Sequence, residues 1–123
     1  MPEPIQPIDS VLDSTKKTLG IDSAYDAFDM DIILHINSVF TTLHQLGVGP
    51  SEGFMITDKT DLWSSYSENS PVLNMVKSYM YVRVRLLFDP PTTSFSLESF
   101  SKQAQEYEWR LQVLTDPQRI QVN

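Results

Sequence analysis

The stretch that decides the fold is DAFDMDIILHINSVFTTLHQLGVGP, which runs from Asp26 to Pro50. Its apolar side chains recur every three or four positions, the period of an α-helix that buries one face: Phe28, Ile32, Ile36, Val39, Phe40, Leu43 and Leu46. Acidic residues crowd the start, where the helix dipole favours them, and Gly47, Gly49 and Pro50 end the helix. The helix would have about 18 residues and a length of about 27 Å. A single apolar stripe of that length needs other helices to cover it, which predicts an all-α fold.

Apolar stripes predict three further long helices and one short helix. The first lies near Asp9–Leu19, and a helix of one or two turns lies around Asp61–Tyr66 and presents Trp63. Ser70 and Pro71 start the next, because a capping hydroxyl precedes proline in the first turn, and the pattern continues to about Phe88. Spacings of three and four mark the last helix, from Leu97 to Leu114. We therefore expect a small all-α bundle of four main helices plus a short helix.

The segments outside these helices have a different composition. Residues 1–7 contain three prolines and predict an extended N-terminal arm, residues 8–115 form the helical domain, and residues 116–123 form a C-terminal arm. Residues 46–60 form a Gly-rich central loop, with three glycines and a proline. Its one apolar cluster, Phe54–Ile56, predicts a short extended segment that could pair with a counterpart in this chain or another.

Composition narrows the class of function. The formal net charge is −7, with nine Lys and Arg against sixteen Asp and Glu, whereas a sequence-reading nucleic-acid binder normally carries a basic patch. Positive charge is concentrated only at Lys16–Lys17 and at Arg83 and Arg85, so we expect no direct grip on phosphates. The lack of cysteine excludes disulfides and thiolate metal sites. Because the sequence shows neither a membrane span nor a leader, we expect a soluble intracellular protein.

No motif predicts catalysis. His35 and His44 lie on opposite sides of their helix, so they cannot bind the same metal ion. Asp31 and His35 are one turn apart, but a metal needs three or four ligands, which favours a surface or interface contact. Helix capping explains Asp26, Asp29 and Asp31 better than a catalytic carboxylate cluster does. Because the sequence also lacks a phosphate loop and a nucleophile elbow, we expect no enzymatic activity, no cofactor and no metal.

The aromatic side chains divide into two groups. Six of them fit the helical stripes and are expected in the core: Phe28, Phe40, Tyr79, Phe88, Phe100 and Tyr107. Trp63 lies outside the long helices, and Trp109 lies off the main stripe of its helix. A tryptophan off the core face often anchors a contact with a partner. Each tryptophan is therefore either an interface anchor or a side chain packed beneath a loop.

The order of these elements and three segments resemble the head–tail connector proteins of tailed bacteriophages, also called head-completion or adaptor proteins. The segments are YDAFDMDIILHINSVFTTLHQLGVGP (Tyr25–Pro50), VKSYMYVRVRLLFDPP (Val76–Pro91) and EWRL (Glu108–Leu111). The resemblance implies a small helical virion subunit at the head–tail junction, assembled in the host bacterial cytoplasm. It implies a dodecameric ring beneath the portal protein that extends the DNA channel and docks the next neck, stopper or tail protein. DNA would pass through the lumen without sequence-specific binding, and no membrane would be involved.

The resemblance also implies that loops and the C-terminal arm contact neighbours and the portal. The predicted protein-interface residues are Phe54, Met55, Ile56, Trp63, Trp109, Arg119, Ile120 and Val122. One alternative is a small acidic helical module that binds a partner protein without forming a ring. A less favoured alternative is a metal-dependent nuclease or hydrolase that uses Asp31 and His35.

Overall fold

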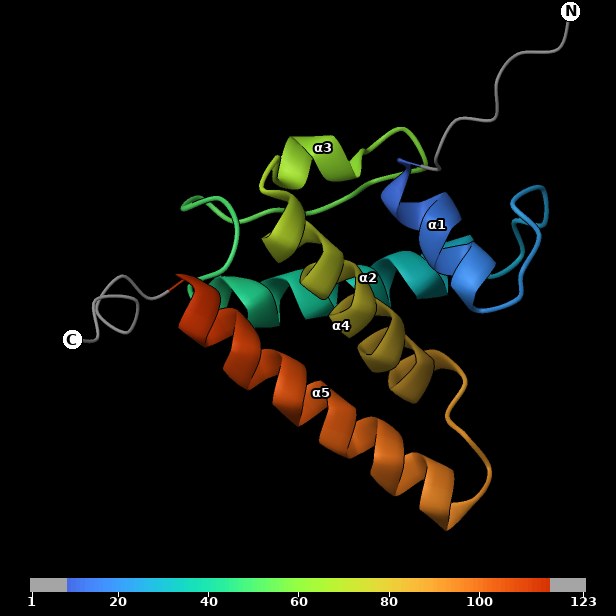
Figure 1. The fold of residues 1–123 in the computed structure, drawn as a ribbon. Helices are drawn as coiled ribbons and strands as arrows, with labels where there is room; N and C mark the ends of the chain where they lie inside the picture. Colours follow the sequence, from blue (N-terminus) through green and yellow to red (C-terminus); the bar gives the residue numbers. More distant parts are fainter. Residues whose placement is uncertain (1–8, 116–123) are drawn as a thin grey trace, which may run out of the picture.

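The structure, a computed structural model, describes residues 9–115 of the 123-residue chain. It contains five helices and, within that range, no strands, which confirms the all-α class (Figure 1). The helices are α1 (Val11–Thr18), α2 (Asp29–Gln45), α3 (Trp63–Tyr66), α4 (Ser70–Phe88) and α5 (Ser94–Thr115). The two predicted arms, residues 1–7 and 116–123, lie outside the described residues, as do Arg119, Ile120 and Val122.

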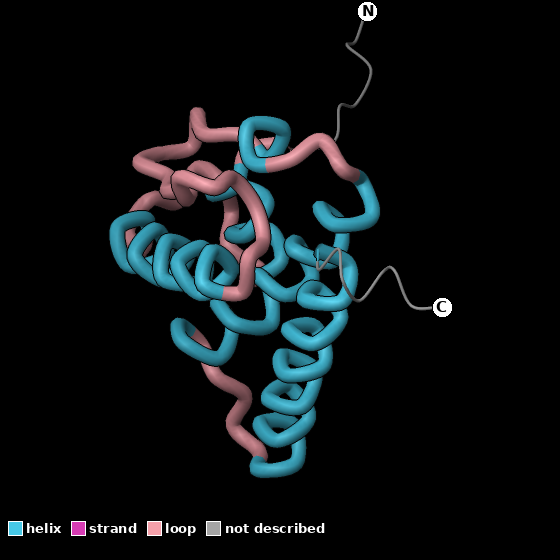
Figure 2. The backbone as a smooth tube through the Cα atoms, turned by 90° about the vertical axis from the view of Figure 1, so that its left-hand side faces the viewer, coloured by secondary structure: helices cyan, strands magenta, loops and turns pink. Residues whose placement is uncertain are grey.

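Helix α4 is the centre of the arrangement. It contacts α1, α2 and α5, and Figure 1 shows α5 running antiparallel beside it after a loop, while α2 crosses it. In the perpendicular view of Figure 2, α2 and α5 lie on different sides of the molecule. The core fills the space between the helices, with Ile36, Phe40, Val76, Tyr79 and Leu111 among its most buried side chains. This layout leaves the outward faces of α2 and α5 far from one another.

The ends of α2 differ in part from the prediction. The helix begins at Asp29, and its N-cap residue Phe28 makes no side-chain capping bond. No aspartate caps this helix with its side chain, but Asp29 and Asp31 lie in its first turn, where the helix dipole favours them, and Asp29 has a further role, described below. The C-terminal end matches the expectation, because Gly47 follows it with a φ of +84°, a conformation that glycine adopts without strain.

The start of α4 also needs one correction. The capping group is the side chain of Asn69, whose Oδ1 accepts a hydrogen bond from the Val72 amide at 3.3 Å. Ser70, which the sequence suggested as the cap, is instead the first helical residue, and Pro71 lies in the first turn. Asparagine and serine cap helices about equally well, so local preference alone does not choose between them.

The segment Phe54–Ile56 runs extended beside α2 but does not pair with a strand. Instead, the side chain of Asn37 on α2 binds both backbone polar groups of Ile56. The Ile56 amide donates to Asn37 Oδ1 at 2.8 Å, and Asn37 Nδ2 donates to the Ile56 carbonyl oxygen at 3.0 Å. The one antiparallel bridge in the described residues joins Ser10 to Leu62. The backbone of Ile56 is therefore already satisfied within the chain.

An aromatic cluster holds the central loop against α2 and α3. The ring of Phe40 lies 5.0 Å from that of Phe54, 5.8 Å from that of Trp63 and 5.0 Å from that of Tyr66, measured between centroids. The indole Nε1 of Trp63 donates a hydrogen bond to Ser14 Oγ at 2.8 Å. Of the two interpretations left open for Trp63, the structure shows packing beneath a loop.

Candidate interaction surfaces

The predicted interface residues that the structure describes fall into two groups. Ile56 and Trp63 are buried in the core of the single chain, so their side chains offer no surface to a partner. Phe54 is half-buried in the aromatic cluster, whereas Met55 and Trp109 are exposed. Contact with another chain stays a prediction for the exposed pair.

Phe54 and Met55 also line a hollow of about 270 Å³ between the central loop and the C-terminal half of α2. Its other lining residues are Phe40, Thr41, His44, Glu52 and Gly53. The hollow is mostly apolar, with one carboxylate and one imidazole at its walls. It has room for one side chain of another molecule.

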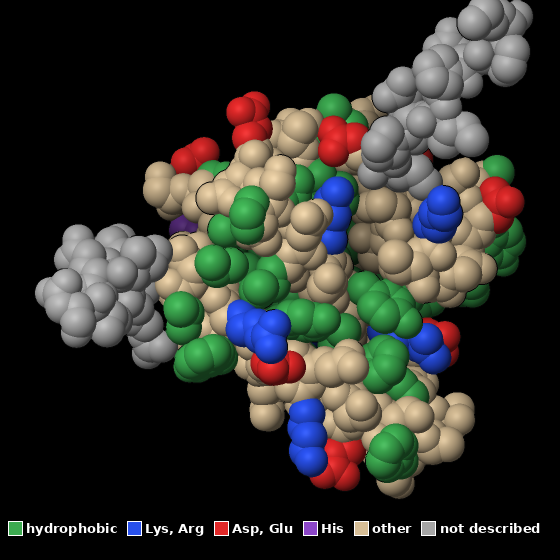
Figure 3. Space-filling view, in the orientation of Figure 1, with side chains coloured by type: hydrophobic (Ala, Val, Ile, Leu, Met, Phe, Trp, Pro, Cys, Tyr) green, Lys and Arg blue, Asp and Glu red, His purple; other side chains and the backbone are tan. Residues whose placement is uncertain are grey.

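Helix α5 presents a face that we call the α5 outer face, formed by Phe95, Lys102 and Trp109. Phe95 is 83% exposed, and Lys102 and Trp109 are also exposed. Figure 3 shows neighbouring basic and acidic side chains along α5, with hydrophobic side chains beside them. Two of these pairs are ion pairs one turn apart, Glu98–Lys102 at 3.3 Å and Glu106–Arg110 at 2.8 Å.

The opposite side of α5 fixes it to α4. Ala104 and Leu111 are the buried residues of the helix. The buried Tyr79 on α4 donates its phenol hydrogen bond to Glu108 Oε2 at 2.7 Å. Burial, and then this bond to Glu108, raise the pKa of Tyr79 above its ordinary value. The orientation of α5, and therefore of its outer face, is set by these contacts.

A second exposed face lies at the N-terminal end of α2. We call it the α2 outer face and define it by Met30, Asp31 and Leu34. Met30 is 81% exposed, and Leu34, one turn further along, is exposed as well. The sequence analysis missed Met30, Leu34 and Phe95, although an apolar residue outside a helix's core stripe is the signal that could have found them.

Aromatic rings flank the α2 outer face. Phe28, predicted to be in the core, is 42% exposed, which corrects that prediction. Its ring packs 5.5 Å from Phe88 at the end of α4 and 5.7 Å from Tyr25, centroid to centroid, and His35 lies 6.3 Å from Phe88. The exposure of Phe28 follows from its place just before α2, where α4 covers it only with its last residue.

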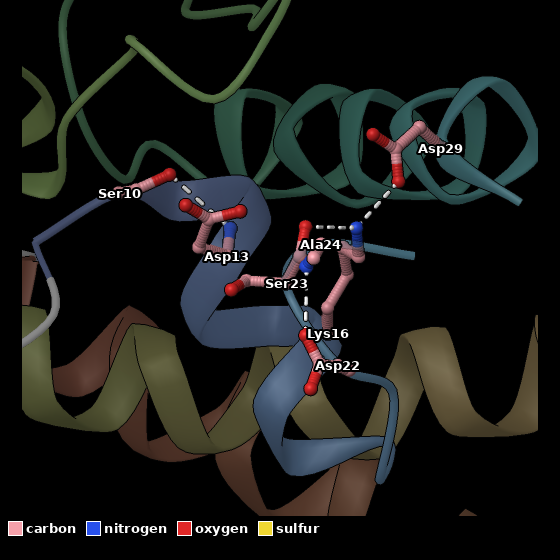
Figure 4. Close-up of polar contacts among 7 residues, drawn as sticks. All are labelled: Ser10, Asp13, Lys16, Asp22, Ser23, Ala24 and Asp29. Carbon is pink, nitrogen blue, oxygen red and sulfur yellow. Dashed lines mark hydrogen bonds and ion pairs between the residues drawn. The ribbon is translucent and has the colours of Figure 1, made fainter. Parts of the chain in front are cut away.

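A buried ion pair fixes α1 to the start of α2. Lys16 is fully buried, and its Nζ lies 2.8 Å from Asp29 Oδ1 and donates to the Ser23 carbonyl oxygen at 3.1 Å (Figure 4). The sequence analysis had named Lys16 and Lys17 as one of two local concentrations of positive charge. Because its charge is neutralised inside the protein, the exposed surface is even poorer in basic groups than composition suggests.

The described residues do not assemble a metal site. Among residues 9–115, no three His, Cys, Asp or Glu side chains lie close enough together to hold a metal ion. Within the same range, no helix is both long and apolar enough to cross a bilayer.

Comparison with known proteins gives one match. A family model described as phage connector protein matches residues 11–118, which covers all five helices of the structure. No curated protein and no solved structure matches the chain. The family match confirms the resemblance drawn from the sequence, since it extends over most of the 123 residues. The chain belongs to the phage connector protein family.

Proposed function

We propose that the protein is a structural subunit of the head–tail junction in a tailed phage virion. In this role it forms a dodecameric ring beneath the portal, extends the DNA channel and provides a docking platform for the next neck, stopper or tail protein. Membership in the connector family supports the structural role in the virion. The role requires no enzymatic activity and no cofactor.

The observation that carries the ring is the presence of two exposed apolar faces on different sides of α4. A ring of identical subunits needs two different surfaces on each subunit, because every copy meets two neighbours through a heterologous contact. The α5 outer face and the α2 outer face supply two such surfaces, with Phe95 and Met30 as their most exposed members. A module that binds one partner needs only one exposed face.

The charge of the chain suits a channel through which DNA slides. Tight binding of DNA depends on Lys and Arg that neutralise phosphates. The chain has a net charge of −7, and Lys16 is already paired inside the protein. DNA would therefore pass the ring without sequence-specific binding and without strong attachment to its wall.

The arms complete the proposal. Residues 116–123, with Arg119, Ile120 and Val122, would reach the portal or a neighbouring subunit, and residues 1–7 would form the second arm. Assembly would take place in the cytoplasm of the host bacterium.

A phage that cannot make this protein tests the proposal. In cells infected by such a phage, we expect filled heads and free tails that do not join, and complementation with the full chain should restore joining. A chain that ends at Thr115 should keep the helical circular dichroism of the full chain and still fail to join heads to tails. Normal joining without the protein would contradict the proposed function, and normal joining by the shortened chain would contradict the arm assignment alone.

A further inference from the structure

We infer that neighbouring subunits meet by placing the α5 outer face of one copy on the α2 outer face of the next, with Lys102 against Asp31. The inference rests on the proposed ring and names the surfaces that build it. The occupant of each face is a second copy of this chain.

The spacing of the α5 outer face is the first step. Phe95, Lys102 and Trp109 are seven residues apart, which is nearly two helical turns, so all three side chains lie on one side of α5. The stripe from Phe95 to Trp109 is about 21 Å long. It places an ammonium group midway between two exposed aromatic side chains. Exposed aromatic residues of this kind are the usual anchors of protein interfaces.

The α2 outer face has the opposite arrangement of charge. Asp31 forms no ion pair with any residue in the described part of the chain, and it is exposed. The residues three and four positions away from Asp31 are Ala27, Phe28, Leu34 and His35. The sequence carries no Asp, Glu, Lys or Arg from Ile32 to Ser51. Asp31 is thus the last charged residue before a long uncharged and largely apolar part of α2, and the other carboxylates near this helix start, Asp26 and Asp29, make the surface acidic as well.

The two faces are complementary. A helix with a cation between aromatic side chains fits a surface with a carboxylate between apolar side chains, because each charge then meets its opposite as water is excluded. Among residues 9–115, Lys102 forms an ion pair only with Glu98, and both side chains are about 70% exposed. Such an exposed pair is weak, so Lys102 can exchange it for Asp31 of a neighbour at little cost.

The positions of the faces determine the kind of assembly. Because α4 lies between α2 and α5, a copy docked on one face leaves the other face free for the next copy. A contact of this type is heterologous and closes into a ring when the rotation between subunits allows. A two-fold dimer would have to form both contacts at once, α5 on α2 and α2 on α5, which requires the two faces to lie in one continuous patch, and α4 separates them.

A charge exchange in the phage tests the pairing. Complementation with Asp31→Lys or Lys102→Asp should each lower the yield of infectious particles by about tenfold or more, because like charges then face one another. The double variant should recover most of the wild-type yield. Lys17→Asp, which reverses an exposed charge on α1, is the control and should leave the yield unchanged. Circular dichroism of each purified variant should match the wild type, because all three positions are exposed.

Zero-length carbodiimide cross-linking of intact wild-type particles gives an independent measurement. We expect an amide bond between the Asp31 carboxylate and the Lys102 amine, formed with loss of water. In particles assembled from a mixture of isotopically labelled and unlabelled subunits, mass spectrometry should find this bond between a labelled and an unlabelled copy. The inference would be overturned by a cross-link from Lys102 to a different virion protein. It would also be overturned if the Lys102 variant had no effect on the yield, or if the double variant were as defective as the single ones. Particles that contain the ring yet give those results would leave the proposed function intact, whereas particles that lack the chain altogether would refute the function itself.

Discussion

The buried pair of Lys16 and Asp29 gives the sharpest prediction about the fold. We consider Asp29→Asn, which keeps the shape of the side chain and removes its charge. The Lys16 ammonium would then be buried with only neutral acceptors, the Ser23 carbonyl oxygen at 3.1 Å and the amide oxygen at position 29, and without a compensating negative charge. Leaving one member of a buried ion pair unpaired costs about 3–5 kcal/mol. Because the Asp29 side chain is 28% exposed, water can approach this end of the pair, and we expect a loss of about 3 kcal/mol.

The reciprocal change should cost much less. Lys16→Met removes the buried charge and fills most of its volume, and it leaves Asp29 with a side chain that is 28% exposed although its Oδ1 atom is buried. We expect a loss of about 1 kcal/mol or less, and the double variant should resemble Lys16→Met rather than the sum of the two single changes.

Urea unfolding followed by circular dichroism measures these free energies of unfolding. The matched control is Arg110→Met, which breaks the exposed pair with Glu106 and should change the free energy by less than about 0.5 kcal/mol. A stability of Asp29→Asn within about 1 kcal/mol of the wild type would refute the reasoning, and so would a larger loss for Lys16→Met than for Asp29→Asn.

Three further predictions concern the central loop and its cluster. Gly49→Ala should destabilise the fold clearly more than Gly47→Ala, although both glycines have a positive φ. Only the methyl group at position 49 would meet the Tyr66 ring, 2.6 Å from its hydroxyl oxygen, and urea unfolding compares the two variants. Asn37→Ala should cost about 1–3 kcal/mol and speed hydrogen exchange of the Ile56 amide, since both backbone groups of Ile56 lose their partner. Tyr66→Phe should be neutral or stabilising at neutral pH, because the buried hydroxyl has no partner among the described residues. Burial also raises the pKa of Tyr66, so the wild type should lose stability as pH rises above about 10, where the unfolded phenol ionises first. The Tyr66→Phe variant should lose less, as pH-dependent unfolding would show; an equal loss in both proteins would contradict this assignment.

Much of the fold could be predicted because the relevant signals are local. The stripe from Ile32 to Leu43 and the stop at Gly47 depend on neighbours within a few positions, and the structure agrees with them closely. The N-cap of α4 was misplaced by one residue, since Asn69 and Ser70 are both good capping residues.

The errors arose where distant contacts decide the outcome. Lys16 follows Leu12 by one turn on the apolar side of α1, which was a signal of burial, but its partner Asp29 belongs to another helix. The burial of Trp63 depends on Phe40 and Ser14, which are far away in the sequence. No local rule brings such residues together.

The exposed faces were the hardest part to predict. Periodicity identifies the side of a helix that faces the core, and it says nothing about which outward apolar residues gather into one surface. Met30 and Leu34 form such a surface because α4 covers only the other side of α2. Trp109 was the one apolar member of either face that the sequence identified, through its place off the α5 stripe.

A cryo-electron microscopy reconstruction of the phage neck tests the central claim most directly. We predict a ring of this chain between the portal and the next neck or tail protein, with α5 of each subunit against the start of α2 in its neighbour. A neck that contains no density for these five helices, or that contains a single copy beside the channel, would contradict the account.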